Sequence, residues 1–174
     1  MFDSPLPPNQ TAADQGKTQM FQRRVFLVVV DASDELHAAL RFASQRARNT
    51  GGRVALLSVT QPPEFQHWMF VGNLMQEEAR LEGEQRLHQA AATVHSCSGD
   101  TPELFLREGD AREELFKLVS EDDGISVVVL AAGTGKDGPG PLVEALTGKH
   151  AGMLRVPVTI VPGDLSDDEI DGLT

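Results

Sequence analysis

Apolar residues gather into short runs along the chain, separated by amphipathic stretches and by turns rich in glycine or proline. Residues 25–30 read Val-Phe-Leu-Val-Val-Val with no polar interruption. Such a run is typical of a strand that is buried on both faces, as in a parallel sheet. Further strands are predicted at 53–59, 102–108, 125–130 and 158–161, where β-branched and other apolar residues recur.

The stretches between these runs carry apolar residues at helical spacing. Ser33 is the predicted N-cap of a first helix that ends near Gly51. Later helices are predicted at 72–95 and 142–153. Another is predicted to begin at Asp110, with Glu113 as its capping-box partner. Strand and helix therefore alternate. This order predicts an α/β fold, a doubly wound five-stranded parallel sheet in a Rossmann-like sandwich.

The composition divides the chain into three parts. Residues 1–22 are polar and contain three prolines, Pro5, Pro7 and Pro8, which predicts a flexible N-terminal tail. Residues 23–162 form the predicted domain. Residues 163–174 carry five acids and no base, so they are expected to be an acidic C-terminal tail that is solvated or contacts a partner.

Charge and cysteine content narrow the functional classes. A formal net charge of -11 argues against nucleic-acid binding and against an anionic membrane surface. No apolar run is long enough to span a bilayer. The single cysteine, Cys97, cannot form an intrachain disulfide. The N-terminus also lacks the pattern of a signal peptide, so we expect a cytoplasmic protein.

Candidate chemistry lies where the predicted strands end, because doubly wound sheets bind ligands beyond the carboxyl ends of their strands. Asp31 and Ser33 follow the first strand, and Val59 closes the second. The fourth strand leads into the glycine-rich segment 133–141, which we call the glycine loop. Its glycines would let backbone N–H groups approach phosphate oxygens closely. Candidate phosphate contacts in this loop are Gly133, Thr134, Gly135, Lys136 and Gly138.

A purely structural interpretation of the glycine loop stays open, since turns with positive φ angles also need glycine. Two familiar phosphate motifs do not fit. The Gly-x-Gly-x-x-Gly spacing that starts at Gly133 follows the fourth strand instead of the first. A P-loop needs Ser or Thr after Gly-Lys, where this chain has Asp137 and His150.

Across residues 23–162 the chain resembles the universal stress protein family. Residues 28–33, Val-Val-Val-Asp-Ala-Ser, resemble the family's first strand, which ends in Asp-x-Ser. Residues 107–110, Arg-Glu-Gly-Asp, resemble the turn after its third strand. Residues 127–135 resemble its fourth strand and the loop that follows, and residues 156–161 resemble its last strand.

The resemblance implies an adenine-nucleotide alpha-hydrolase-like fold and ATP, with Mg²⁺, as a ligand. Asp31 matches the family's aspartate on the adenine side. Gly135, Gly138 and Gly148 match the glycine spacing of ATP-binding members, but Lys149 stands where they have a hydroxyl residue. An alignment from the last strand instead places Glu144 and Ala145 where these members have the glycine and the hydroxyl residue. The resemblance also implies a homodimer built by pairing the last strands of two subunits.

Three functions therefore remain open for the chain. The first is a regulatory protein in the stress response that binds a small ligand such as ATP and acts as a homodimer. The second is an interaction module that binds an unknown protein partner and has lost nucleotide affinity. The third is a slow ATP hydrolase, although the sequence shows no nucleophile with a positioned base.

Overall fold

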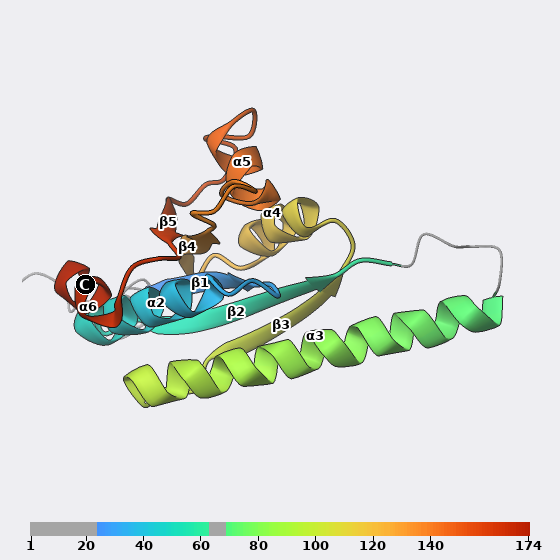
Figure 1. The fold of residues 1–174 in the computed structure, drawn as a ribbon, viewed down its shortest axis with the longest axis horizontal. Coiled ribbons are helices and arrows are strands. Elements are labelled where there is room, and N and C mark those ends of the chain that lie inside the picture. The colour runs from blue at the N-terminus through green and yellow to red at the C-terminus, as the bar shows by residue number, and fades with distance from the viewer. Residues whose placement is uncertain (1–23, 63–68) are drawn as a thin grey trace, which may run out of the picture.

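The strands form one parallel sheet with the order β3-β2-β1-β4-β5 (Figure 1). The computed structural model describes residues 24–62 and 69–174. The strands are β1 (Val25–Val30), β2 (Arg53–Thr60), β3 (Glu103–Glu108), β4 (Ile125–Ala132) and β5 (Val158–Pro162). Because β1 pairs with β2 on one side and with β4 on the other, the winding direction reverses at β1. The predicted doubly wound five-stranded sheet is confirmed.

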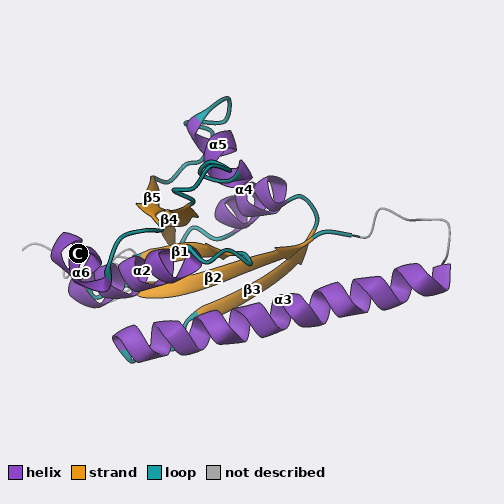
Figure 2. Cartoon of the chain, viewed as in Figure 1, coloured by secondary structure: helices purple, strands orange, loops and turns teal. Residues whose placement is uncertain are grey.

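Helices cover both faces of the sheet (Figure 2). Residues of α2 (Leu36–Thr50) and α3 (Met69–Ser98) pack on one face, and residues of α4 (Ala111–Glu121) and α5 (Pro141–Thr147) pack on the other. In β1, Phe26 and Val28 face the first core, whereas Val25 and Leu27 face the second. This burial on both sides explains why the strand is apolar at every position.

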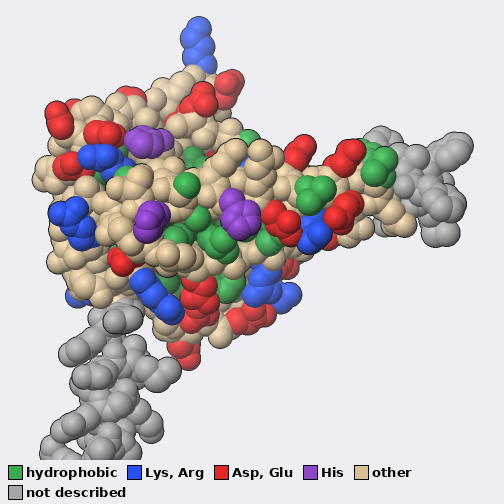
Figure 3. All heavy atoms as spheres, turned by 90° about the horizontal axis from the view of Figure 1, so that it is seen from below, with side chains coloured by type: hydrophobic (Ala, Val, Ile, Leu, Met, Phe, Trp, Pro, Cys, Tyr) green, Lys and Arg blue, Asp and Glu red, His purple; other side chains and the backbone are tan. Residues whose placement is uncertain are grey.

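The long helix α3 is packed unevenly. At Gly83 a Cβ atom would lie 2.8 Å from Leu106 Cδ1 and 2.8 Å from Thr60 Cγ2, so the helix backbone approaches β2 and β3 closely there. Nearer its start, α3 projects beyond the sheet (Figure 1) and exposes Leu74 and Met75. Figure 3 shows charged side chains of both signs on the α3 face, with apolar side chains between them. The part of α3 after Gly83 is therefore the part that the sheet supports.

The predicted helix start at Ser33 is wrong. Helix α2 begins at Leu36, and the Ser33 hydroxyl donates to Asp31 Oδ1 at 2.6 Å instead of accepting from the helix. A Ser side chain can bond within its own loop as readily as at a helix end, and here the local bond prevails. The cap at Asp110 is confirmed, since its Oδ1 accepts from the Glu113 N–H at 3.0 Å.

The last predicted helix, 142–153, is shorter in the structure. Helix α5 ends at Thr147, and the N–H of Gly148 donates to the Glu144 carbonyl at its end. Gly152 has φ +81°, which does not suit a helix. The residues after α5 therefore form turns that lead to β5.

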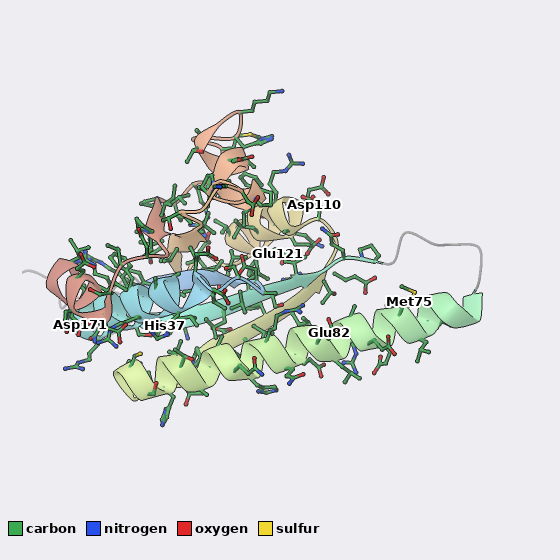
Figure 4. The ribbon with its side chains drawn as sticks, in the orientation of Figure 1. His37, Met75, Glu82, Asp110, Glu121 and Asp171 are labelled. Carbon is green, nitrogen blue, oxygen red and sulfur yellow. The ribbon has the colours of Figure 1, made fainter. Side chains whose placement is uncertain are left out.

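The structure also corrects the prediction that the acidic C-terminal segment is a solvated tail. Residues Asp167–Leu173 form helix α6, whose Ile170 is fully buried. The Arg41 guanidinium of α2 binds Asp171 through two hydrogen bonds, of 2.9 and 2.7 Å, and lies 2.9 Å from Asp167. Asp167 and Asp171 thus face basic side chains of α2, and these contacts fasten the segment to the domain. Figure 4 shows Asp171 at the same end of the molecule as His37 of α2.

The predicted N-terminal tail, 1–22, lies outside the described residues. Among the described helices, none is both long and apolar enough to cross a membrane.

Candidate functional site

The carboxylate of Asp31 lies directly beyond the carboxyl end of β1, where the winding of the sheet reverses. Its Oδ1 accepts two hydrogen bonds from Ser33, one from the N–H at 3.0 Å and one from the hydroxyl at 2.6 Å. This turn fixes one carboxylate oxygen and leaves the other, Oδ2, for a ligand. Ser33 thus acts on the site by orienting Asp31.

Three hollows adjoin at Asp31, which lines all of them. The largest, about 540 Å³, lies between the start of α2 and α3, and we call it the helix cavity. The second, about 330 Å³, lies beyond β1 and β2 and is called the strand cavity. The third, about 150 Å³, lies beneath the glycine loop and is called the loop cavity. Shared residues join them, because Arg86 lines the first two and Ala111 lines the last two.

The loop cavity has mainly apolar walls. Beside Asp31 and Ala111, its lining consists of residues from the ends of β1 and β4 and from the glycine loop with the start of α5: Val29, Leu130, Ala131, Pro139, Gly140, Pro141, Leu142 and Val143. Val29 and Leu130 are side chains of central strands, so they hold this wall rigidly. A flat group with apolar faces, such as a nucleobase, suits these surroundings.

The strand and helix cavities are more polar. In the strand cavity, Val59 supplies an apolar wall, while Glu82 and Arg86 of α3 supply charges of opposite sign. The helix cavity adds His37 of α2 and Gln89 of α3. In Figure 4, Glu82 lies in the middle of α3 and His37 on the neighbouring helix α2. The sheet edge thus offers an apolar hollow on one side of Asp31 and a polar groove on the other.

The structure brings only some of the predicted site residues together. Asp31, Ser33 and Val59 line joined cavities. The glycine loop reaches these cavities only through residues 139–141, which were not among its predicted contacts. Gly133 is packed behind them, since a Cβ atom there would lie 2.6 Å from the Gly138 carbonyl oxygen. This close approach folds the loop back on the end of β4.

The remaining predicted residues lie away from Asp31. Thr134, Gly135 and Lys136 form an exposed turn, closed by the Gly138 N–H donating to the Gly135 carbonyl at 3.3 Å. Gly148 and Lys149 are exposed beyond the far end of α5. As far as the described residues go, none of these five lines the helix, strand or loop cavity.

The residue that sequence reasoning missed is Arg86. Its side chain is 29% exposed and lies 3.7 Å from Glu82 Oε2, so it is turned toward both polar cavities without a short bond to its neighbour. The sequence contained one usable signal. Arg86, Gln89 and Thr93 recur at helical spacing on the side of α3 next to its buried residues, where apolar residues would be expected.

The acidic groups around Asp31 do not form a metal site by themselves. Within residues 24–62 and 69–174, no group of three His, Cys, Asp or Glu side chains is arranged to hold a metal ion. Any Mg²⁺ here would therefore need oxygen ligands from a bound phosphate as well as from the protein.

Comparison with known proteins identifies the family and supports the fold. The model of the universal stress protein family matches residues 22–162. A universal stress protein from Lactobacillus plantarum superimposes with a TM-score of 0.67 at 17% identity, covering 80% of this chain and 98% of the other. A family member from Burkholderia pseudomallei gives 0.62 at 25% identity, covering 82% and 97%.

A third match, the universal stress protein from Archaeoglobus fulgidus in complex with dAMP, gives a TM-score of 0.57 at 19% identity and covers 81% of this chain and 98% of its own. Other matched universal stress protein structures are complexes with cAMP and with AMP. Comparison with curated proteins gave no match. Because the family model spans most of the chain, this protein belongs to the universal stress protein family.

Proposed function

We propose that the protein is a cytoplasmic regulatory module that binds an adenine nucleotide around Asp31. The observation that carries the proposal is the position of this carboxylate, at the switch point of the sheet and at the junction of three cavities. Adenine nucleotides in the matched universal stress proteins support the choice of ligand. ATP with Mg²⁺ is the finer form of the same proposal.

Each part of the site has a task in this proposal. Asp31, fixed by Ser33, accepts a hydrogen bond from a ribose hydroxyl or from the adenine amino group. Val59 and the 139–141 segment form apolar walls. Contacts of the ligand with Gly133, Gly135, Gly138 and Gly148, or with Thr134, Lys136 and Lys149, remain a prediction from the sequence.

Titration calorimetry of the full chain with AMP, ATP and ATP plus Mg²⁺ tests the proposal. Asp31→Asn keeps an oxygen that can accept from Ser33 but removes the charge, so we expect at least about tenfold weaker binding. Asp123→Asn is the matched control, because the Asp123 side chain is 96% exposed and remote from the cavities. Equal affinities for the wild type and Asp31→Asn would contradict the proposal.

Two other outcomes lead to the alternative functions. A wild-type protein that binds none of these nucleotides, and whose unfolding temperature they do not raise, fits an interaction module. A ligand at 100 times its dissociation constant should stabilise the fold by about 2.7 kcal/mol. Release of phosphate from ATP above background, lost in Asp31→Asn, would instead favour a slow hydrolase.

We also propose that the protein acts as a homodimer through β5. This strand pairs with β4 and ends the sheet order, so its outer edge can pair with the β5 of a second copy. Thr159→Lys would bring two like charges together across such a contact and should shift the mass seen by light scattering toward the monomer. Leu104→Lys, on the opposite edge strand β3, is the control. A Thr159→Lys protein that keeps the wild-type mass overturns the β5 contact.

A further inference from the structure

Helix α3 presents two long faces, and the sheet covers one of them. Leu87, Ala90 and Val94 are buried on the side toward the sheet. The opposite side carries exposed residues at alternating spacings of four and three, and we call this set the outer face of α3: Leu74, Glu78, Leu81, Gln85, His88 and Ala92. The spacing is that of the contact positions in a coiled coil, so the outer face is suited to packing on another helix.

The apolar side chains of the outer face lie where the sheet gives α3 little support. Leu74 is 61% exposed and Leu81 is 51% exposed. The segment around Leu74 projects beyond the sheet (Figure 1), and on its inner side Gln76 donates to the Glu108 carboxylate of β3 at 2.9 Å. This polar contact holds the inner side toward β3, so the two leucines remain in water. Exposed apolar side chains that gather in this way mark an interaction surface.

Two polar side chains of the outer face are not engaged by the described part of the chain. Arg80, on the flank of the helix, is already bound by Glu77 at 3.1 Å and by Glu84 at 2.6 Å. Within residues 24–62 and 69–174, neither Glu78 nor His88 makes an ion pair or a side-chain hydrogen bond. A carboxylate and an imidazole are therefore available on this face for a partner outside the chain.

Charge is distributed unequally along α3. Residues 72–84 contain four acids and one arginine, whereas residues 85–98 contain one arginine, two histidines and no acid. In Figure 3, acidic and apolar side chains cover the projecting part of α3, and histidine side chains follow over the part that the sheet supports. A surface with this gradient is complementary to itself when a second copy lies against it in the opposite direction, as twofold symmetry requires.

We propose that two copies of the protein associate through the outer faces of their α3 helices, which pack antiparallel about a twofold axis at the level of Gly83. In this register Glu78 lies opposite His88 of the second copy, and the imidazole donates to the carboxylate. Leu74 lies opposite Ala92 of the second copy, whose small side chain leaves room for a leucine. This contact goes beyond the proposed function, because it depends neither on nucleotide binding nor on the β5 edge.

The twofold axis also brings the two Leu81 side chains together. Each stands two residues from the level of Gly83, so the two are about 6 Å apart along the helix. Leu81→Lys would place two like charges there and should lower the mass of the full chain seen by light scattering. Leu173→Lys is the matched control, since Leu173 of α6 is 61% exposed. Both leucines are exposed, so neither substitution should unfold the chain.

An exchange of charges tests the register. Sedimentation equilibrium is measured on the chain carrying Thr159→Lys, so that pairing through β5 does not contribute, and we expect a dimer. Glu78→Lys would set a cation against His88, and His88→Glu would set an acid against Glu78, each at two symmetry-related places. Either change should weaken this dimer about tenfold, and the double variant should return to within about threefold of the parent. Asp123→Lys, at a side chain that is 96% exposed and outside α3, is the control and should change the dimer by less than about twofold.

The outcomes separate this contact from the other proposals. Residues 78 and 88 are about 15 Å apart within one helix, farther than their charges act at physiological salt, so recovery in the double variant requires contact between copies. A double variant as weak as the single variants would overturn the antiparallel pairing. A Leu81→Lys chain with the wild-type mass, or a Thr159→Lys chain that is monomeric at about 100 µM, would overturn the α3 contact altogether. AMP affinity should be the same in Leu81→Lys as in the wild type, because Leu81 is not part of the three described cavity linings.

Discussion

Helices α5 and α6 have seven residues each and flank β5 in the sequence, but different forces hold them. Helix α6 is fixed by side chains: Ser166 and Glu169 form a capping box, and Arg41 binds two of its acids. Helix α5 begins at Pro141, and the residue before it, Gly140, has φ +98° and makes no side-chain cap bond. Its shape therefore depends on backbone angles that glycine and proline allow.

This difference matters for the site, because α5 and the residues before it form a wall of the loop cavity, whereas α6 contributes to none of the three cavity linings in the described part of the chain. Because α5 is shaped by its backbone, it brings no charged side chain into the loop cavity. Helix α6 is held by ion pairs and lies away from the cavities, so its charges do not meet a ligand. Changes to α6 should then affect stability alone, and changes at Gly140 should affect binding as well.

The largest expected effect comes from the apolar anchor of α6. Replacing the fully buried Ile170 with Ala should lower the free energy of unfolding by about 2–4 kcal/mol, through lost burial and a cavity. Chemical denaturation measures this loss, and AMP affinity should not change. Leu173→Ala is the control on the same helix, since Leu173 is 61% exposed. A loss no larger than that of the control would mean that α6 is not anchored through Ile170.

Substitution of Gly140 should lower the free energy of unfolding by less than Ile170→Ala does, but it should also weaken AMP binding. An alanine there must adopt a φ angle of +98°, which L-residues rarely accept, so Gly140→Ala should cost about 1–2 kcal/mol or move the loop. Because Gly140 lines the loop cavity, AMP affinity should fall as well. At Gly172 of α6 the φ angle is not positive and an added Cβ meets nothing within 4 Å, so Gly172→Ala is the control for both measurements. Unchanged AMP affinity in Gly140→Ala would remove the loop cavity from the binding site.

The smallest expected effect is a pH dependence confined to α6. The hydrogen bond from Arg41 holds the pKa of Asp171 below its ordinary value of 3.8, and hydrogen bonds from the Ser166 N–H and hydroxyl likewise lower the pKa of Glu169 from 4.5. Carboxylates with a lowered pKa in the folded state stabilise it at neutral pH, and that stabilisation is lost as the pH falls below about 4. Amide hydrogen exchange should then increase in α6 before it increases in α5. A simultaneous increase in both helices would show that the acids do not fasten α6 separately.

The sequence predicted the sheet well because its signals are local. The unbroken apolar run of β1 and the Asp110 cap depend on residues within a few positions of each other, and both agree with the structure. The partners of α6 are not local, since Arg41 and Asp171 lie 130 positions apart, so five acids alone suggested a solvated tail. Asp31 was predicted from the end of its strand. Arg86 was missed because its approach to Asp31 depends on how α3 lies across the sheet, which no periodicity reveals.

The tight crossing at Gly83 has a consequence for the evolution of such a groove. The missing side chain lets α3 descend onto β2 and β3, and the next turn of the helix then carries Arg86 down to the level of Asp31. A descendant with alanine at this position would have to displace the side-chain ends of Leu106 and Thr60 or hold the helix farther from the sheet. In the second case Arg86 would be unaltered but would move away from Asp31, so a glycine with no chemistry of its own contributes to where the arginine lies.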